Sequence, residues 1–171
     1  MLEKQNYIPS KYRDTPYELE TIQTFVGKNN DYFINKWEQS NDPDTKAGWN
    51  WAGFLTGLFW LGYRKMYKLL FIYFGAFIVI DIVQILLNID VNSAVGAAIS
   101  ASIGGFGNGF YHKHMIAKLD KMTFDNNGQH PAHEDIAKTG GASWGGVGIT
   151  FLMFIGYIII STAIEMAFMF I

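Results

Sequence analysis

The side chains most able to do chemistry in this sequence are a few polar groups set among long apolar stretches. Asp81 is the only charged residue between Leu69 and Leu87. An acid inside such a stretch is costly to bury as an ion, so it binds a cation or proton, or it hydrogen bonds to polar groups on neighbouring helices. Its candidate partners are Gln84, Asn108 and Glu165. The set predicts either a cation or proton site, or a neutral Asp81 that stabilises helix packing by ~0.6 kcal/mol per contact.

Other kinds of chemistry find no support in the sequence. The absence of cysteine excludes disulfides, thiolate metal sites and cysteine nucleophiles. The spacing of the histidines, and of the glycines at 140–148, matches neither a zinc hydrolase motif nor a phosphate loop. A formal net charge of −2 provides no basic field for nucleic acid. We therefore expect no metal, no cofactor, no catalytic residue and no nucleic-acid partner. The histidines are His112, His114, His130 and His133.

The charges divide the chain into the segments that must position these polar groups. All 13 Lys and Arg residues lie within residues 1–68 and 113–138. The apolar runs outside these blocks are close to the ~20 residues that a helix needs to cross a hydrocarbon core. The sequence therefore predicts an all-α integral membrane protein with three transmembrane helices. Its expected segments are a cytoplasmic helical segment (1–48), an aromatic and basic interfacial helix (49–68), a transmembrane hairpin (69–111), a cytoplasmic loop (112–145) and a C-terminal transmembrane helix (146–171).

The positions of the basic residues also predict an orientation. Lys and Arg near spanning segments favour the cytoplasmic side. Both basic blocks adjoin helix ends that the hairpin places on one side, so we expect the N-terminal segment and the loop 112–145 in the cytoplasm. The chain is then a multi-pass protein of the cell membrane, and its turn 88–92 and its C-terminus lie on the outer side of the membrane. The first ~40 residues lack the apolar core of a signal peptide, so we expect insertion to depend on the internal spans.

Two short amphipathic helices are predicted within residues 1–48. Residues 15–18, Thr-Pro-Tyr-Glu, have the pattern of a capping box with Pro at the first helical position, and Gly27 suits a helix end. A second helix over residues 31–39 places three apolar side chains on one face: Phe33, Ile34 and Trp37. These faces either pack on each other or on the membrane surface, or dock a partner.

Residues 49–68 combine aromatic side chains with a basic cluster. At 1.5 Å per residue, the part from Trp49 to Gly62 is about 21 Å long, which is too short to span a membrane. Trp and Tyr favour the headgroup layer, where Lys and Arg contact lipid phosphates. The segment therefore predicts an interfacial or re-entrant helix in contact with membrane lipids. The residues expected at the headgroups are Trp49, Trp51, Trp60, Tyr63, Arg64, Lys65 and Lys68.

The predicted second span, 91–111, carries a small residue at every fourth position. Such spacing lets the backbones of membrane helices approach closely. We expect it to be the central packing helix, facing either the other spans or another copy of the chain. The expected packing positions are Ala97, Ala101, Gly104 and Gly105.

Three groups of residues carry a resemblance to a known family. The first is Phe25-Val26-Gly27, Asn29, Asp31-Tyr32-Phe33 and Lys36-Trp37; the second and most specific is Trp49-Asn50-Trp51-Ala52, Gly57, Phe59-Trp60 and Tyr63-Arg64-Lys65-Met66-Tyr67. The third is Gly107-Asn108, Tyr111 and His114, then Gly140-Gly141-Ala142-Ser143-Trp144. Together they resemble small bacterial membrane proteins that share domain of unknown function 2628. Gly53 and Leu58 depart from the alanine and proline common there. The resemblance implies membrane location and architecture, and it offers no activity to carry over.

Two hypotheses of function follow. In the first, a non-enzymatic membrane protein acts through assembly, as a homo-oligomer or as an accessory or regulatory subunit of a partner membrane protein. In the second, an oligomer conducts ions or protons by means of the intramembrane Asp81.

Overall fold

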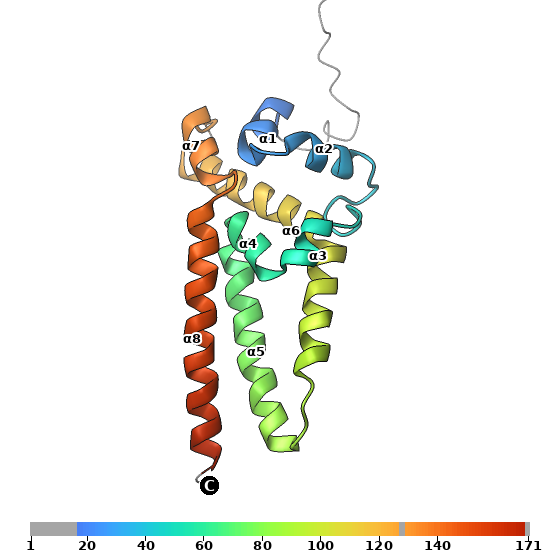
Figure 1. Ribbon diagram of the computed structural model, residues 1–171. Helices are drawn as coiled ribbons and strands as arrows, with labels where there is room; N and C mark the ends of the chain where they lie inside the picture. Colours follow the sequence, from blue (N-terminus) through green and yellow to red (C-terminus); the bar gives the residue numbers. More distant parts are fainter. Residues whose placement is uncertain (1–16, 127–128, 170–171) are drawn as a thin grey trace, which may run out of the picture. The chain divides into compact units, whose positions relative to one another are not determined.

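The computed structural model describes residues 17–126 and 129–169, and the described chain is helical without strands. This confirms the all-α prediction. Figure 1 shows the order of the helices. Their bounds are α1 Leu19–Val26, α2 Asn30–Glu38, α3 Trp51–Thr56, α4 Leu58–Tyr63, α5 Tyr67–Leu87, α6 Asn92–Asp125, α7 His133–Thr139 and α8 Trp144–Met169.

The chain forms two compact units, and α6 contributes to both. Unit 1 comprises the residues up to Gly48 together with Asn108–Ala142, and unit 2 comprises Trp49–Gly107 together with residues from Ser143 onward. The boundary falls inside α6, which therefore belongs to unit 2 in its first half and to unit 1 in its second.

Unit 1 has a core of apolar side chains from α1, α2, α7 and the second half of α6. α1, α2 and α6 supply them at helical spacing, so that one face of each is buried, and α7 supplies Ile136. The predicted burial of Phe33, Ile34 and Trp37 on one face of α2 is confirmed. The other core side chains are Ile22, Phe25, Val26, Tyr111, Met115, Leu119 and Ile136.

The predicted start of the first helix is wrong. The helix begins at Leu19, after an extended Glu18 whose side chain makes no capping hydrogen bond. Tyr17 is buried, and its hydroxyl donates to Asp120 Oδ1 at 2.6 Å. The first two residues of the predicted capping box, Thr15 and Pro16, lie outside the described residues. The predicted end at Gly27 is confirmed by its positive φ of 60°.

The predicted cytoplasmic loop 112–145 is mostly helical. α6 continues to Asp125, and α7 follows at His133–Thr139. Tyr111, Met115 and Leu119 recur every four residues and are all fully buried. An apolar stripe at this spacing stabilises a helix through packing, even though the surrounding sequence is polar.

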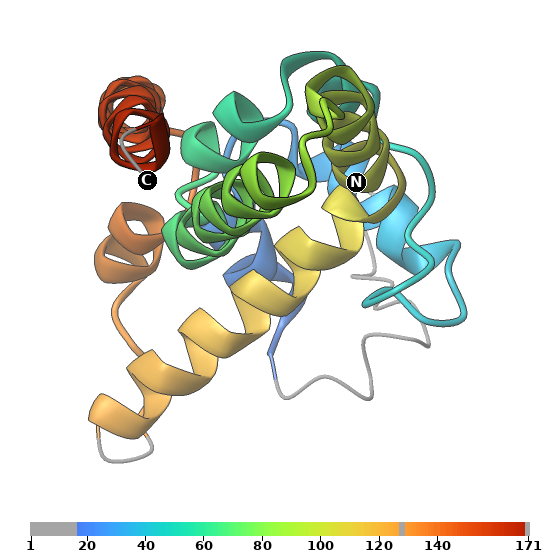
Figure 2. The ribbon, with the colours of Figure 1, turned by 90° about the horizontal axis from the view of Figure 1, so that it is seen from below.

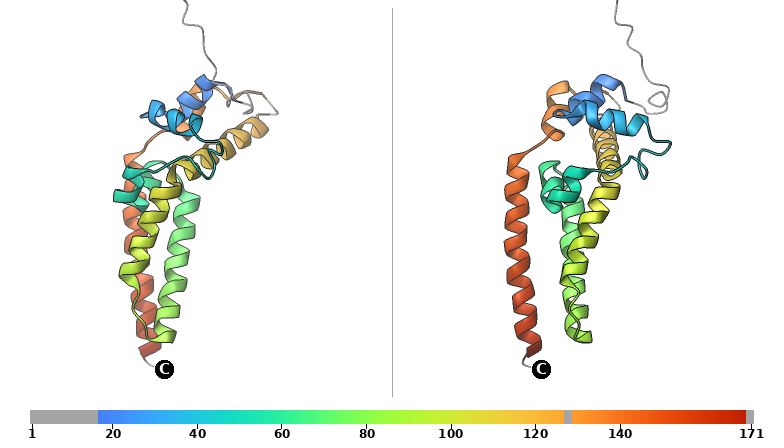
Figure 3. Two further views of the ribbon diagram at one scale, coloured as in Figure 1. Left: turned by 90° about the vertical axis from the view of Figure 1, so that its right-hand side faces the viewer. Right: turned by 45° about the vertical axis from the view of Figure 1, so that its right-hand side comes forward.

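Unit 2 contains the longest apolar helices. α5 and α8 run in parallel (Figures 1 and 3), joined by ring contacts of Phe74 with Phe154 and of Phe77 with Tyr157. α4 contacts both of them (Figure 2). The α5–α6 turn lies at one end of unit 2, called here the turn end. The other end, where α4 meets α5, is called the basic end because it carries Arg64, Lys65 and Lys68.

Two helical stretches in the described chain are long and apolar enough to cross a membrane by length and composition: α5, and the stretch that ends with α8. Only 17% of the apolar window of the first and 6% of that of the second is buried. The part of α6 that matches the predicted second span, 91–111, is less apolar, because it is rich in Gly, Ser and Asn. The structure therefore supports two of the three predicted spans on this criterion.

The aromatic segment is two short helices rather than one. α3 ends and α4 begins at Gly57, whose φ of 54° and ψ of −127° belong to a region that side chains with a Cβ avoid. α4 then crosses α8 in very close contact. A Cβ on Gly146 would lie 2.0 Å from the carbonyl oxygen of Gly62, so only glycine fits at this crossing.

Candidate functional site

A cavity of about 550 Å³ lies at the turn end of unit 2. It brings together three of the four polar residues predicted as a set, namely Asp81, Gln84 and Glu165, but not Asn108. The other residues that line it are Ile85, Asn88, Ile89, Asp90, Asn92, Phe168 and Met169. α5, the α5–α6 turn and the end of α8 thus place three carboxyl groups around one space.

Asp81 lies at the α5–α8 contact and is 9% exposed. Its Oδ2 accepts a hydrogen bond from the Ser161 hydroxyl at 2.8 Å, and the Tyr157 hydroxyl interacts with the same carboxyl group. Sequence reasoning missed both of these partners. The available signal was the spacing of Tyr157, Ser161 and Glu165, which lie four residues apart and therefore on one face of a helix.

The Gln84 side chain hydrogen bonds to the α5–α6 turn. Its Nε2 donates to Asn92 Oδ1 at 3.1 Å, and its Oε1 accepts from the backbone N–H of Val91 at 2.7 Å. The side chain is buried, so both ends of its amide are satisfied where α5 joins α6. Gln84 therefore holds the hairpin closed, whereas sequence reasoning gave it the role of a companion to Asp81.

The acidic groups around the cavity have no basic counterpart at the turn end. Asp81, Asp90 and Glu165 are the only acids of unit 2, and its only Lys and Arg residues are at the basic end. Carboxylates in such a setting attract small cations or protons. Among the described residues, however, no group of three or more His, Asp or Glu side chains is arranged to hold a metal ion.

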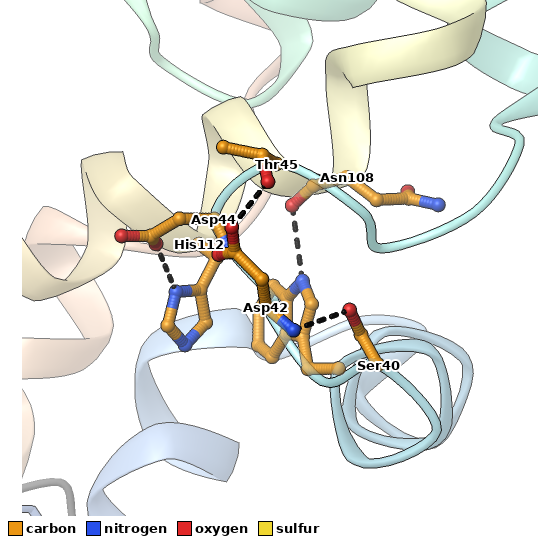
Figure 4. A network of polar contacts seen from close by, with 7 residues as sticks. Ser40, Asp42, Asp44, Thr45, Asn108 and His112 are labelled. Atoms are coloured by element: carbon orange, nitrogen blue, oxygen red, sulfur yellow. Dashed lines mark hydrogen bonds and ion pairs between the residues drawn. The ribbon is translucent and has the colours of Figure 1, made fainter.

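Asn108 belongs to unit 1, where it anchors a loop (Figure 4). The side-chain nitrogen of Asn108 donates to the backbone carbonyl oxygens of Gly48 at 3.1 Å and Ala47 at 3.3 Å. The backbone carbonyl oxygen of Asn108 accepts from Trp37 Nε1 at 3.0 Å. The predicted pairing of Asn108 with Asp81 is therefore wrong. Asn108 is completely buried because it satisfies backbone groups of the incoming loop.

The same loop is fixed by a buried histidine. His112 Nδ1 lies 2.7 Å from Asp44 Oδ1. In the turn that contains Asp44, the Asp42 N–H donates to the Ser40 hydroxyl oxygen, and the Thr45 hydroxyl donates to the Asp42 carboxylate (Figure 4). These histidine and carboxylate contacts stabilise unit 1 and do not line the cavity.

The residues predicted at lipid headgroups fall into three groups by exposure. Trp49, Trp51 and Lys68 are exposed, whereas Trp60 and Arg64 are buried inside unit 2, at odds with a headgroup role. The intermediate residues are Tyr63, whose ring packs against that of Trp144, and Lys65, which has a positive φ of 58°.

The small residues of α6 that were predicted to pack also differ in exposure. Gly104 is buried, and a Cβ there would lie 2.7 Å from the Trp49 ring. Gly105 is half-buried, whereas Ala97 and Ala101 are exposed. Only the part of the stripe nearest the basic end packs within unit 2.

Comparison with known proteins gives one match. A family model described as "Protein of unknown function (DUF2628)" matches residues 13–116. The chain belongs to this family. The DUF2628 match includes Asp81 and Gln84, but it ends before Ser161 and Glu165 and before Gly140–Trp144. No curated protein and no solved structure matches the chain.

Proposed function

We propose that this DUF2628 protein is a multi-pass protein of the cell membrane that acts through assembly, either with itself or as an accessory subunit of another membrane protein. The observation that carries the proposal is the exposure of α5 and α8. A helix that is apolar all round is normally buried in a core or surrounded by lipid. These two are mostly exposed, and side chains such as Phe71, Leu86 and Leu152 point outward.

Hydroxyl groups of unit 2 form hydrogen bonds within the protein, which supports a lipid environment for this unit. Where no water is available, a hydroxyl must hydrogen bond within the protein. Ser102 donates to the carbonyl oxygen of Ile99 at 2.9 Å, and Thr150 donates to that of Gly146 at 3.0 Å. The polarised charge of unit 2 supports the orientation proposed here, with the basic end at the cytoplasm and the first half of α6 as the second of three spans.

The exposed small residues of α6 support assembly as the mode of action. Ala97 and Ala101 face outward, and the Cα of Gly96 has open space where a Cβ would lie. In lipid, helices associate through faces of this kind because small side chains allow close backbone contact. No catalytic step is part of the proposal.

The assembly proposal is tested by cysteine crosslinking in membranes, since the chain has no cysteine of its own. A97C is expected to form a disulfide-linked dimer, or a crosslink to a stoichiometric partner after treatment with a heterobifunctional reagent. V79C, on the exposed side of α5, is the matched control and is expected to crosslink less. A strictly monomeric native mass with no co-purifying protein would contradict the proposal.

Orientation is tested with an impermeant maleimide on intact cells. D90C in the α5–α6 turn is expected to label, and K121C on α6 is expected to label only after lysis. The reverse pattern would overturn the proposed topology and leave the assembly proposal standing.

A second candidate function, ion or proton transport by an oligomer, is favoured by the cavity at the turn end. Its three carboxyl groups, Asp81, Asp90 and Glu165, have no basic residue near them in unit 2. In proteoliposomes that contain a pH-sensitive dye, transport predicts a flux that D81N abolishes while the protein stays folded. A flux no greater than that of protein-free vesicles would count against this candidate.

A further inference from the structure

The break between α3 and α4 at Gly57 lies part of the way along the long helices of unit 2, measured from the basic end. A Cβ on Gly57 would lie 3.9 Å from Ser100 Oγ, and the nearby Ser102 hydroxyl hydrogen bonds that of Tyr73. Because Tyr73 is six residues into α5, Gly57 lies about 10 Å from the basic end at 1.5 Å per residue. The break between the two short helices is therefore well inside the length of α5.

α4 brings the chain back from this depth to the basic end. Phe59 stacks on Phe154, with ring centroids 5.4 Å apart, and Phe154 is ten residues, about 15 Å, past the start of α8. At the other end of α4, the Tyr63 carbonyl oxygen accepts from the Ser143 N–H at 2.8 Å, directly before α8 begins. At the start of the segment, the Asn50 N–H donates to the Gly104 carbonyl oxygen, which lies past Ser100 toward the basic end, so the segment begins and ends closer to the basic end than Gly57 does.

The two faces of α3 have different surroundings. On one face, Gly53 packs so closely on α6 that a Cβ would lie 2.9 Å from the Ile103 side chain. On the other face, Trp51 is 66% exposed and Leu55 is 74% exposed. A large apolar face at this depth requires an apolar neighbour, since its exposure to water is costly.

The polar groups at the two ends of α3 are satisfied within unit 2, as an environment without water requires. The exposed Thr56 turns its hydroxyl back to donate to the Ala52 carbonyl oxygen at 2.7 Å. The buried Asn50 accepts from the Gly53 N–H at 2.8 Å, and its own N–H donates to the Gly104 carbonyl oxygen at 2.7 Å. Irregular backbone at membrane depth is tolerated only where it is buried in this manner.

We propose that residues 49–63 form a re-entrant helix pair whose outer face, Trp51 and Leu55, contacts the acyl chains of anionic phospholipids in the cytoplasmic leaflet. This inference rests on the proposed membrane location. Charge complementarity identifies the occupant: residues 49–80 contain no acid, and the half-buried Lys65 and the exposed Lys68 lie where the segment returns to the basic end, next to the buried Arg64. Anionic headgroups pair with such a cluster while their acyl chains extend along α3.

The test is a depth measurement on the full chain in vesicles of phosphatidylcholine and phosphatidylglycerol. A nitroxide on L55C reports its accessibility to oxygen, which concentrates in acyl chains, relative to a water-soluble nickel complex. V79C on α5 is the membrane control and K46C, in the loop of unit 1, is the aqueous control. We expect the oxygen-to-nickel ratio at L55C to exceed that at K46C several-fold and to approach that at V79C.

The other possible accessibility ratios distinguish a failure of the re-entrant arrangement from a failure of the proposed membrane location. A ratio at L55C equal to that at K46C, with V79C still in acyl chains, would overturn the re-entrant arrangement and leave the membrane proposal intact. Shielding of L55C from both reagents would mean that protein covers α3, which also overturns it. An aqueous ratio at V79C would instead overturn the proposed function. Quenching of Trp fluorescence by brominated lipid, reduced in W51F, provides a readout that does not need a label at position 55.

Discussion

In unit 1 the side chains of Trp37, Tyr111 and Leu119 are enclosed in one core, whereas in unit 2 the equally apolar Phe71, Leu86 and Leu152 face outward. Unit 1 also fixes its loop with a buried asparagine and a buried histidine. Both units place glycine where backbones approach closely, with Gly140 against Phe25 in unit 1 and Gly146 against Gly62 in unit 2. The two units therefore differ in where their large apolar side chains lie.

The proposed membrane location accounts for this difference, because lipid would remove from water the apolar side chains that unit 2 leaves exposed. In unit 1, the apolar stripes of several helices meet one another instead.

The largest effect is expected from truncating the same residue type in the two units. Trp37 is fully buried and donates to Asn108, so W37A is expected to lower the free energy of unfolding by about 3–5 kcal/mol. W51A removes an exposed ring from α3 and is expected to change it by less than about 1 kcal/mol. Thermal denaturation of the purified variants measures both. Equal losses would show that unit 2 encloses Trp51 as unit 1 encloses Trp37.

A single methyl group is expected to separate α4 from α8. G146A places a Cβ 2.0 Å from the backbone carbonyl oxygen of Gly62, and backbone cannot move aside cheaply, so we expect a loss of about 3 kcal/mol. Gly148 lies on the same helix with no atom within 4 Å of a Cβ, so G148A is the matched control. The yield of monodisperse protein and its melting temperature report the effect. A stable G146A variant would show that the crossing is not essential to unit 2.

The stability of unit 1 is expected to depend on pH through His114. Burial, with a smaller contribution from Lys118, lowers the pKa of His114 to about 4. The unfolded chain binds a proton near pH 6.5 while the folded chain does not, so stability is complete above pH 6.5 and falls as the pH decreases toward 4. We expect a loss of about 2 kcal/mol between pH 7 and pH 5.

The measurement is the melting temperature at pH 7 and pH 5 for the wild type, H114Q and H130Q. H114Q cannot be protonated and is expected to remove most of the pH dependence, whereas H130Q changes an exposed histidine and is expected to keep it. An unchanged slope in H114Q would assign the pH dependence to other groups.

The basic end of unit 2 is expected to select lipids. K68Q removes an exposed charge from the first turn of α5, which is expected to weaken attraction to anionic headgroups by about 1 kcal/mol, or roughly fivefold. The ratio of phosphatidylglycerol to phosphatidylcholine that co-purifies with the protein measures this selectivity. K121Q, on the α6 part of unit 1, is the control and is expected to leave the ratio unchanged. A similar fall in both variants would indicate a general charge effect.

The smallest effect is expected at the hydrogen bond between Ser161 and Asp81. S161A removes a bond of 2.8 Å between α8 and α5, and such bonds contribute ~0.6 kcal/mol on average between membrane helices. T162A changes the adjacent exposed hydroxyl and is the control. A steric-trap or denaturant measurement in bicelles resolves a difference of this size when repeated. A loss several times larger would mean that Asp81 is ionised and depends on Ser161 to stabilise its charge.

Features that depend on local sequence were predicted well. The apolar run 69–87 differs from α5 by two residues at its start, and the run 146–171 begins two residues after α8 does. The turn 88–92 is confirmed by the left-handed conformation of Asn88. Apolar length, glycine and short polar turns act on the backbone directly, so they can be recognised without knowledge of contacts.

The sequence by itself therefore determined the helical class, the two long apolar helices, the polarised charges and the family. Only the tertiary structure decided which polar groups meet: Ser161 with Asp81, Gln84 with the turn and Asn108 with the loop of unit 1. It also decided that α6 continues past Tyr111 and that the aromatic segment breaks at Gly57. These features depend on contacts between residues up to 80 positions apart, and local spacing carries no information about which helix faces will pack together.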